Sequence, residues 1–135
     1  MSRKIVCNIL TPEKLLYEGE VDHAVIQSFN GRMGFLYNHA PLISTLGVGS
    51  VRLDTTNSTE QLWVENGIVE VKNNKMIILA ETAYKKDDID KAKLEEELNE
   101  VKERLNNLEK YSEDRFTYQL ERDKITGKIN FISRN

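Results

Sequence analysis

The segment GIVEVKNNKMIILA, residues 67–80, decides how the first part of this chain folds. Val69 and Val71 alternate with polar residues before Asn73-Asn74, and an apolar set that includes Ile78 follows them. Alternation with a period of two indicates half-buried β-strands. Asparagine tolerates the positive φ angles of a tight two-residue turn. The segment therefore predicts an antiparallel β-hairpin.

Short apolar runs on both sides of this hairpin continue the same pattern from Ile5 to about Ala83. Many short strands within about eighty residues favour an antiparallel β-sandwich, because two packed sheets bury both inner faces. We expect about ten strands, with turns at 11–12, 30–31, 55–59, 66–67 and 73–74. The strands that can be placed are 5–10, 14–17, 21–28, 33–36, 42–46, 49–54, 60–65, 67–72 and 75–80.

The character of the sequence changes after Tyr84. A charged linker, residues 85–88, precedes a segment without glycine or proline until Gly127. Apolar residues then recur at steps of four and three, which is the seam of a packed helix. These residues are Leu94, Leu98, Val101, Leu105 and Leu108. We therefore divide the chain into a sandwich domain at 1–84 and a helical domain at 85–135.

A second helix is predicted after Ser112, which suits a helix cap. Its apolar positions are Phe116, Tyr118, Leu120, Ile125, Ile129 and Ile132. The link between the helices is short, so they must fold into an antiparallel hairpin or open into one extended rod. The second helix is basic and the first is acidic, and exposed charge pairs between them would hold the hairpin shut only weakly. The basic residues are Arg115, Arg122, Lys124, Lys128 and Arg134.

Composition excludes several classes of function. The chain has 135 residues and a formal net charge of -3, so it lacks the basic field that nucleic-acid binding requires. His23 and His39 have no cysteine or carboxylate at metal-ligand spacing, and no phosphate-binding loop is present. Cys7 stands in an apolar run and is interpreted as a core residue. We expect no catalytic residue, no metal and no resident cofactor.

One loop stands out, NGRMGFLYNHAPL at residues 30–42, and it resembles a signature of the epsilon subunit of F-type ATP synthases. The resemblance keeps its order and spacing across residues 5–90. Its other motifs are Thr11-Pro12, LYEGEV at 16–21, Gly47-Val48-Gly49 with Val51-Arg52, GIVEV at 67–71, IILAETA at 77–83 and Asp88-Ile89-Asp90. It implies a noncatalytic rotor subunit with a β-sandwich and two helices, in agreement with the architecture derived from periodicity.

The resemblance also implies partners. The sandwich would bind the gamma subunit and, through its loops, the membrane ring of c subunits. Residues expected to face the c-ring are Asn30, Gly31, Arg32 and Met33, with His39 near them. Alternatively, Gly31 and Gly34 are only turn residues and His39 is a surface histidine. Many family members have proline where this chain has Tyr37, so we expect a less rigid loop here.

The helical hairpin would act as a brake on ATP hydrolysis. By resemblance its basic face, Arg115, Arg122, Lys124 and Lys128, would meet the alpha and beta catalytic subunits. Some members also bind ATP at the hairpin, which here nominates Glu81, Asp90 and Lys93. Lys93 replaces an arginine and loses its planar fork, which argues against ATP as a regulatory ligand. An alternative for the tail is a poorly ordered C-terminus.

Two other functions are open. The chain could be a stand-alone sandwich and coiled-coil binding module that self-associates through the 94–108 seam, although we expect no obligate homo-oligomer. It could also be a small enzyme with a site around His39. No apolar run is long enough to span a membrane and no transit-like N-terminus is present, so we expect a peripheral protein at the cytoplasmic face of a bacterial membrane.

Overall fold

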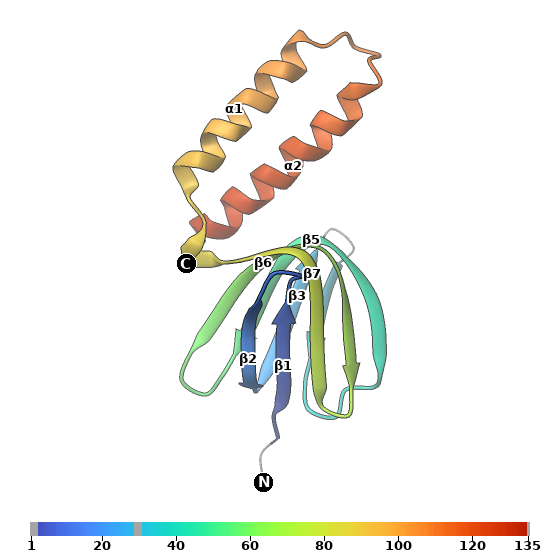
Figure 1. The fold of residues 1–135 in the computed structure, drawn as a ribbon, viewed down its shortest axis with the longest axis vertical. Helices are drawn as coiled ribbons and strands as arrows, with labels where there is room; N and C mark the ends of the chain where they lie inside the picture. Colours follow the sequence, from blue (N-terminus) through green and yellow to red (C-terminus); the bar gives the residue numbers. More distant parts are fainter. Residues whose placement is uncertain (1–2, 29–30, 135) are drawn as a thin grey trace. The chain divides into compact units, whose positions relative to one another are not determined.

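The computed structural model describes residues 3–28 and 31–134. Seven strands form one sheet in the order β2-β1-β7-β6-β5-β3-β4, and two helices follow it (Figure 1). The strands are β1 Ile5–Leu10, β2 Leu15–Val21, β3 His23–Ser28, β4 Gly31–Phe35, β5 Leu42–Asp54, β6 Thr59–Lys72 and β7 Lys75–Lys85. A 3-10 turn, η1 Lys86–Asp88, leads to helix α1 Lys91–Asn107 and helix α2 Asp114–Ser133.

The sheet is antiparallel except where β1 pairs parallel to β7, with Val6 opposite Lys75 and Leu10 opposite Leu79. β1 is therefore held between β2, its neighbour in sequence, and β7, the last strand of the sequence. The long strands β5, β6 and β7 curve so that the sheet folds over on itself as a sandwich (Figure 1). All seven strands contribute side chains to one apolar core, which includes Ile9, Phe35 and Ile78.

Cys7 lies in this core with no exposed surface, as its apolar neighbours predict. Burial raises the pKa of its thiol to about 12, because the core cannot solvate a thiolate. The thiol is therefore protonated at neutral pH and serves as a small apolar side chain.

The expectation of about ten short strands is wrong in one respect, because two pairs of predicted strands are each continuous. β5 joins the predicted 42–46 and 49–54, and β6 joins 60–65 and 67–72. Asn66 has φ 56° but does not reverse the chain. The pairing of Leu46 with Gly67 and of Val48 with Glu65 continues on either side of it. Asn66 is therefore a kink inside a strand, and the predicted turn at 66–67 is absent.

The kink has a partner in each neighbouring strand. In β5 the buried side chains stand at even-numbered positions up to Leu46 and at odd-numbered positions from Val51 onward. The same change from even to odd occurs between Val64 and Val69 in β6 and between Ala80 and Ala83 in β7. Because the inward-facing side changes at the same level in all three strands, the residue pairing between them stays the same on both sides of the kink.

The hairpin at residues 67–80 is confirmed. Lys72 pairs with Lys75, and Asn73 and Asn74 between them have φ 53° and 61°. Two successive positive φ angles match the right-handed twist of the flanking strands, which is why asparagine suits both positions.

The helices lie side by side and antiparallel (Figure 1). The chain separates into two compact units, one up to Lys86 and one from Asp87 onward. Asp90 caps α1 by accepting a hydrogen bond from the Lys93 N–H at 3.3 Å. Ser112 precedes α2 by two residues, and its hydroxyl accepts from the Asp114 N–H at 3.3 Å, close to its predicted role as a cap.

Candidate docking surfaces

An apolar band crosses the outside of the layer that contains β1 and β2. The register aligns Ile68 with Leu79, Leu79 with Leu10, and Leu10 with Leu15 across four strands. Ile68, Leu79 and Leu15 are 47%, 53% and 48% exposed, and Ile43 on β5 is 72% exposed. These five residues, Leu10, Leu15, Ile43, Ile68 and Leu79, are called the outer apolar face.

The sequence analysis did not identify this face. Its signal is the unbroken apolar run from Met76 to Ala80, in which Met76, Ile78 and Ala80 are buried while Ile77 and Leu79 point outward. A strand that is apolar on both faces needs a covering layer on each. A contiguous exposed apolar patch of this kind marks a protein interaction surface.

The loop between β4 and β5 is held by its own contacts. The His39 N–H donates to the Leu36 carbonyl at 3.0 Å, and Asn38 has φ 66°. The His39 ring packs against Phe35 with centroids 4.9 Å apart, and its Nδ1 lies 2.7 Å from the Ala40 carbonyl oxygen. Leu36 is 59% exposed, so the loop displays an apolar side chain next to a fixed histidine.

A contact of His39 with the ring beside Gly31, Arg32 and Met33 stays a prediction. Those three residues begin β4, whereas His39 follows its other end at Phe35. Four residues of extended strand separate Gly31 from Phe35 by about 13 Å. Arg32 is exposed opposite Gln27, and Gly31 has φ 122°, which favours glycine. Asn30, also expected at this contact, lies outside the described residues.

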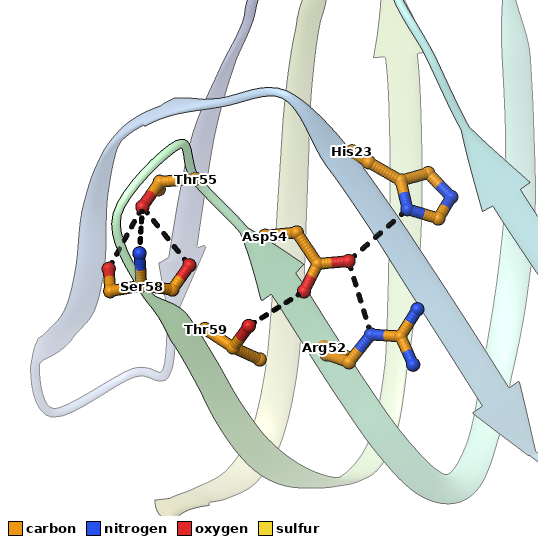
Figure 2. Close-up of polar contacts among 6 residues, drawn as sticks. All are labelled: His23, Arg52, Asp54, Thr55, Ser58 and Thr59. Atoms are coloured by element: carbon orange, nitrogen blue, oxygen red, sulfur yellow. Dashed lines mark hydrogen bonds and ion pairs between the residues drawn. The ribbon is translucent and has the colours of Figure 1, made fainter.

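A polar cluster at one end of the sheet was also missed (Figure 2). The Asp54 carboxylate meets His23 Nδ1 at 3.3 Å, Arg52 Nε at 3.2 Å and the Thr59 hydroxyl at 3.1 Å. Burial would raise the pKa of Asp54, but the hydrogen bonds from Thr59 and His23 and the charge of Arg52 outweigh it, so the pKa is lowered. The carboxylate links β3, β5 and β6. Among residues 3–28 and 31–134, no three His, Cys, Asp or Glu residues gather as metal ligands.

The predicted basic residues of α2 make contacts within the helical unit. Arg115 donates to the Leu105 carbonyl of α1 at 2.9 Å. Arg122 pairs with Asp123 at 3.3 Å, and Lys124 pairs with Glu121 at 3.5 Å. Between the helices, Arg104 donates to the Tyr118 hydroxyl at 3.0 Å.

The helical unit leaves other side chains uncovered. Tyr111, Phe116 and Leu120 are exposed by 88%, 67% and 54%. The α1 seam, by contrast, turns inward, with Leu94 and Leu105 buried. The exposed side of α2 therefore carries apolar groups, and its basic residues are half-buried.

Two of the three nucleotide candidates have partners within the chain. Glu81 accepts from the Asn66 side-chain amide at 3.2 Å, and Asp90 is the cap of α1. Lys93 is exposed in the first turn of α1. Glu81 belongs to the sandwich, whereas Asp90 and Lys93 belong to the helical unit. The described part of the chain holds no helix that is both long and apolar enough to cross a membrane.

Comparison with known proteins places this architecture in a family. Residues 4–86 match the family model described as ATP synthase, Delta/Epsilon chain, beta-sandwich domain. The ATP synthase epsilon chain of Leptospira interrogans is 40% identical over 89 residues, 66% of this chain and 70% of that relative. That of Alkalihalophilus pseudofirmus is 40% identical over 103 residues, 71% of this chain and 77% of the relative.

Solved structures support the same fold. A chain of the Euglena gracilis mitochondrial ATP synthase, determined as OSCP/F1/c-ring, aligns with a TM-score of 0.74 at 17% identity, covering 98% of this chain and 79% of that one. A chain of the Tetrahymena thermophila enzyme, determined as central stalk/c-ring, aligns with a TM-score of 0.58 at 13% identity, covering 97% and 95%. The match of residues 4–86 and the 40% identity to bacterial relatives show that this chain belongs to the ATP synthase delta/epsilon family.

Proposed function

We propose that this chain is a noncatalytic subunit of the central stalk of an F-type ATP synthase. In this role it couples the gamma subunit to the proton-translocating c-ring, and its helices restrain ATP hydrolysis. The observation that carries the proposal is the outer apolar face, a preformed docking surface on a rigid sandwich. It occurs in a chain whose relatives are named ATP synthase epsilon chains.

The outer apolar face is the proposed site of gamma. Covering a large aliphatic side chain contributes about 1.5–3 kcal/mol. Four residues of the face, Leu15, Ile43, Ile68 and Leu79, have about half or more of their surface available for burial. Because they lie on paired strands, little conformational entropy is lost when a partner covers them.

The c-ring contact is proposed at the start of β4, where Gly31, Arg32 and Met33 follow Ser28 of β3. Arg32 is exposed and supplies a cation that can pair with polar loops of the ring. His39 lies at the other end of β4, only a few residues before Ile43. We therefore group His39 with the gamma surface rather than with the ring contact.

The helical unit is the proposed brake. It is compact by itself, and its second helix exposes Phe116 and Leu120 in addition to its basic residues. Arg122 and Lys124 pair with acidic neighbours through exposed contacts worth about 0.2–1 kcal/mol each. Such pairs exchange at low cost for acidic groups of the alpha and beta subunits. Through the complex, the chain would sit peripherally on the cytoplasmic face of a bacterial membrane.

Add-back to ATP synthase from cells that lack this gene tests the proposal. We expect the full chain to bind the complex and lower ATP hydrolysis. A chain that ends at Lys86 should bind with comparable affinity, because it retains the sandwich, but should leave hydrolysis high. Failure of the full chain to bind would contradict the stalk role, and equal inhibition by both chains would remove the brake from the helices.

The docking face has its own test. Ile68→Asp places a charge at the centre of the outer apolar face and should weaken binding to the gamma-containing complex at least about tenfold, which is a loss of about 1.4 kcal/mol. Asn57→Asp, in the exposed turn between β5 and β6 and away from both proposed contacts, is the control. Equal affinity of the two variants would refute the assignment, and a stable homodimer lost only in Ile68→Asp would favour self-association instead.

A further inference from the structure

Two turns that are far apart in the sequence are joined by reciprocal side-chain hydrogen bonds. The Asn38 N–H donates to Asn74 Oδ1 at 2.6 Å, and Asn74 Nδ2 donates to Asn38 Oδ1 at 3.3 Å. Both residues have positive φ, 66° for Asn38 and 61° for Asn74. The tight β6–β7 turn thus holds the loop between β4 and β5. This pair is called the asparagine lock.

Asn74 is the fixed half of the lock. It is the second residue of a two-residue turn whose ends, Lys72 and Lys75, are paired. Its carbonyl also accepts a hydrogen bond from the Val6 N–H of β1 at 3.0 Å. β1, β6 and β7 are central strands of the sheet, so the position of Asn74 is determined by the core itself.

Asn38 lies in the loop between β4 and β5, which is not part of a strand. The chain leaves β4 at Phe35 and enters β5 at Leu42, and exposed Leu36 and Tyr37 lie between them. The hydrogen bond from the His39 N–H to the Leu36 carbonyl bends this loop locally. The asparagine lock instead ties the loop to a residue 36 positions away in the sequence.

The loop leads into β5, the strand that carries Ile43 of the outer apolar face. Leu36 and Tyr37 are 59% and 39% exposed, and Ile43 of that face stands two residues after Pro41. The β6–β7 turn that holds Asn74 follows Val71, which pairs with Leu42. The lock therefore lies where the loop joins the border of the face.

We propose that Asn74 is a positioning residue that fixes the Leu36–His39 loop as the border of the gamma-docking surface. The inference rests on the proposed function. Asn74 does not itself need to contact gamma; it determines the conformation in which Leu36, Tyr37 and His39 are presented. A loop ordered before binding loses less entropy on association, which raises affinity.

The neighbouring residue provides a matched control. Asn73 has nearly the same backbone angle, φ 53°, and lies in the same turn, but the lock uses only Asn74. Glycine at either position keeps the positive φ and the turn. Asn74→Gly therefore removes the lock alone, and Asn73→Gly repeats the backbone change without touching it. Asn74→Asp retains the oxygen that accepts from the Asn38 N–H.

The experiment measures two quantities for the full chain and these variants: the exchange rate of the Asn38 amide, and affinity for ATP synthase from cells that lack the gene. We expect Asn74→Gly to speed exchange and to weaken binding by about five- to tenfold, the worth of one such hydrogen bond. Asn73→Gly should match the wild type, and Asn74→Asp should retain most of the affinity. Because the lock also stabilises the fold, Asn74→Gly should unfold at a temperature about 2–8 °C below that of Asn73→Gly, and both variants should remain folded under the binding conditions.

The outcomes separate the two claims. A wild type that binds while Asn74→Gly binds equally well overturns the positioning role and leaves the stalk function intact. Equal exchange at Asn38 in all variants overturns the lock. A wild type that does not bind the complex refutes the proposed function, and the positioning role falls with it.

Discussion

The sandwich and the helical hairpin are stabilised by different kinds of interaction. Every strand of the sandwich sends side chains into one core, and its pairings link residues as distant as Val6 and Lys75. The hairpin buries Leu94, Leu105, Ile125 and Phe131 and is otherwise held by caps and surface contacts. Cooperative burial makes the first unit a scaffold, whereas local interactions of about 1 kcal/mol each make the second adjustable.

The largest expected effect tests this contrast with two phenylalanines. Phe35→Ala empties a fully buried position and should lower the free energy of unfolding by about 3–5 kcal/mol. Phe116→Ala removes a side chain that is 67% exposed, and its effect should stay within about 0.5 kcal/mol. Denaturant titration provides the measurement, followed by the fluorescence of Trp63 for Phe35→Ala and by helical circular dichroism for Phe116→Ala. Similar losses in both variants would erase the distinction between the units.

Two glycines of β5 test how closely the strands approach. A Cβ on Gly49 would overlap the Gln27 carbonyl oxygen of β3, whereas one on Gly47 would meet no atom within 4 Å. Gly49→Ala should therefore cost about 1–3 kcal/mol, and Gly47→Ala much less. Thermal unfolding of the two variants is the test, and the reverse order of stability would contradict the close packing at Gly49.

The cap of α1 should affect only the hairpin. Asp90→Ala removes the acceptor for the Lys93 N–H and should destabilise the start of α1 by about 1 kcal/mol. Amide exchange in residues 91–95 should accelerate, while the unfolding midpoint reported by Trp63 stays unchanged. Asp88→Ala removes the same charge without removing the cap. A shift of the Trp63 midpoint by Asp90→Ala would show that the units unfold together.

The smallest effect depends on pH. Because the pKa of Asp54 is lowered in the folded state, its stabilisation is present above the unfolded pKa of about 3.9 and is lost as the pH falls through the folded value. The stability advantage of the wild type over Asp54→Asn should thus be largest near neutral pH and shrink on acidification. We expect it to stay below about 1 kcal/mol, since the group is partly solvated. An advantage that grows toward pH 3 would reverse the sign.

Periodicity and turn chemistry predicted most of the strands, the Asn73-Asn74 hairpin and both helices, because these depend on neighbours in sequence. The pair Asn66-Gly67 predicts a turn, but the positive φ of Asn66 belongs to a bend within a continuous strand. A residue that tolerates positive φ suits both structures, so its type alone does not distinguish them. The same limit applies to the docking surfaces. The outer apolar face, the Asp54 cluster and the asparagine lock each depend on register between distant strands.

The separation of His39 from Gly31 could not be predicted from sequence for the same reason. The loop at residues 30–42 is continuous in sequence and suggests a single contact site, yet the strand within it carries its two ends apart. The assignments of c-ring, gamma and catalytic-subunit contacts stay predictions, and the two ends of β4 can be tested separately by substituting Arg32 and His39.

The parallel pairing of β1 with β7 has a consequence for biosynthesis. β1 leaves the ribosome early, but one of its two edges has no neighbour until Lys75–Leu79 has been made. A pairing that closes so long a loop forms slowly, so the nascent chain carries an open strand edge through most of its translation. Early release of a truncated product would leave this edge available for aggregation, which makes β7 the segment whose synthesis completes a soluble product.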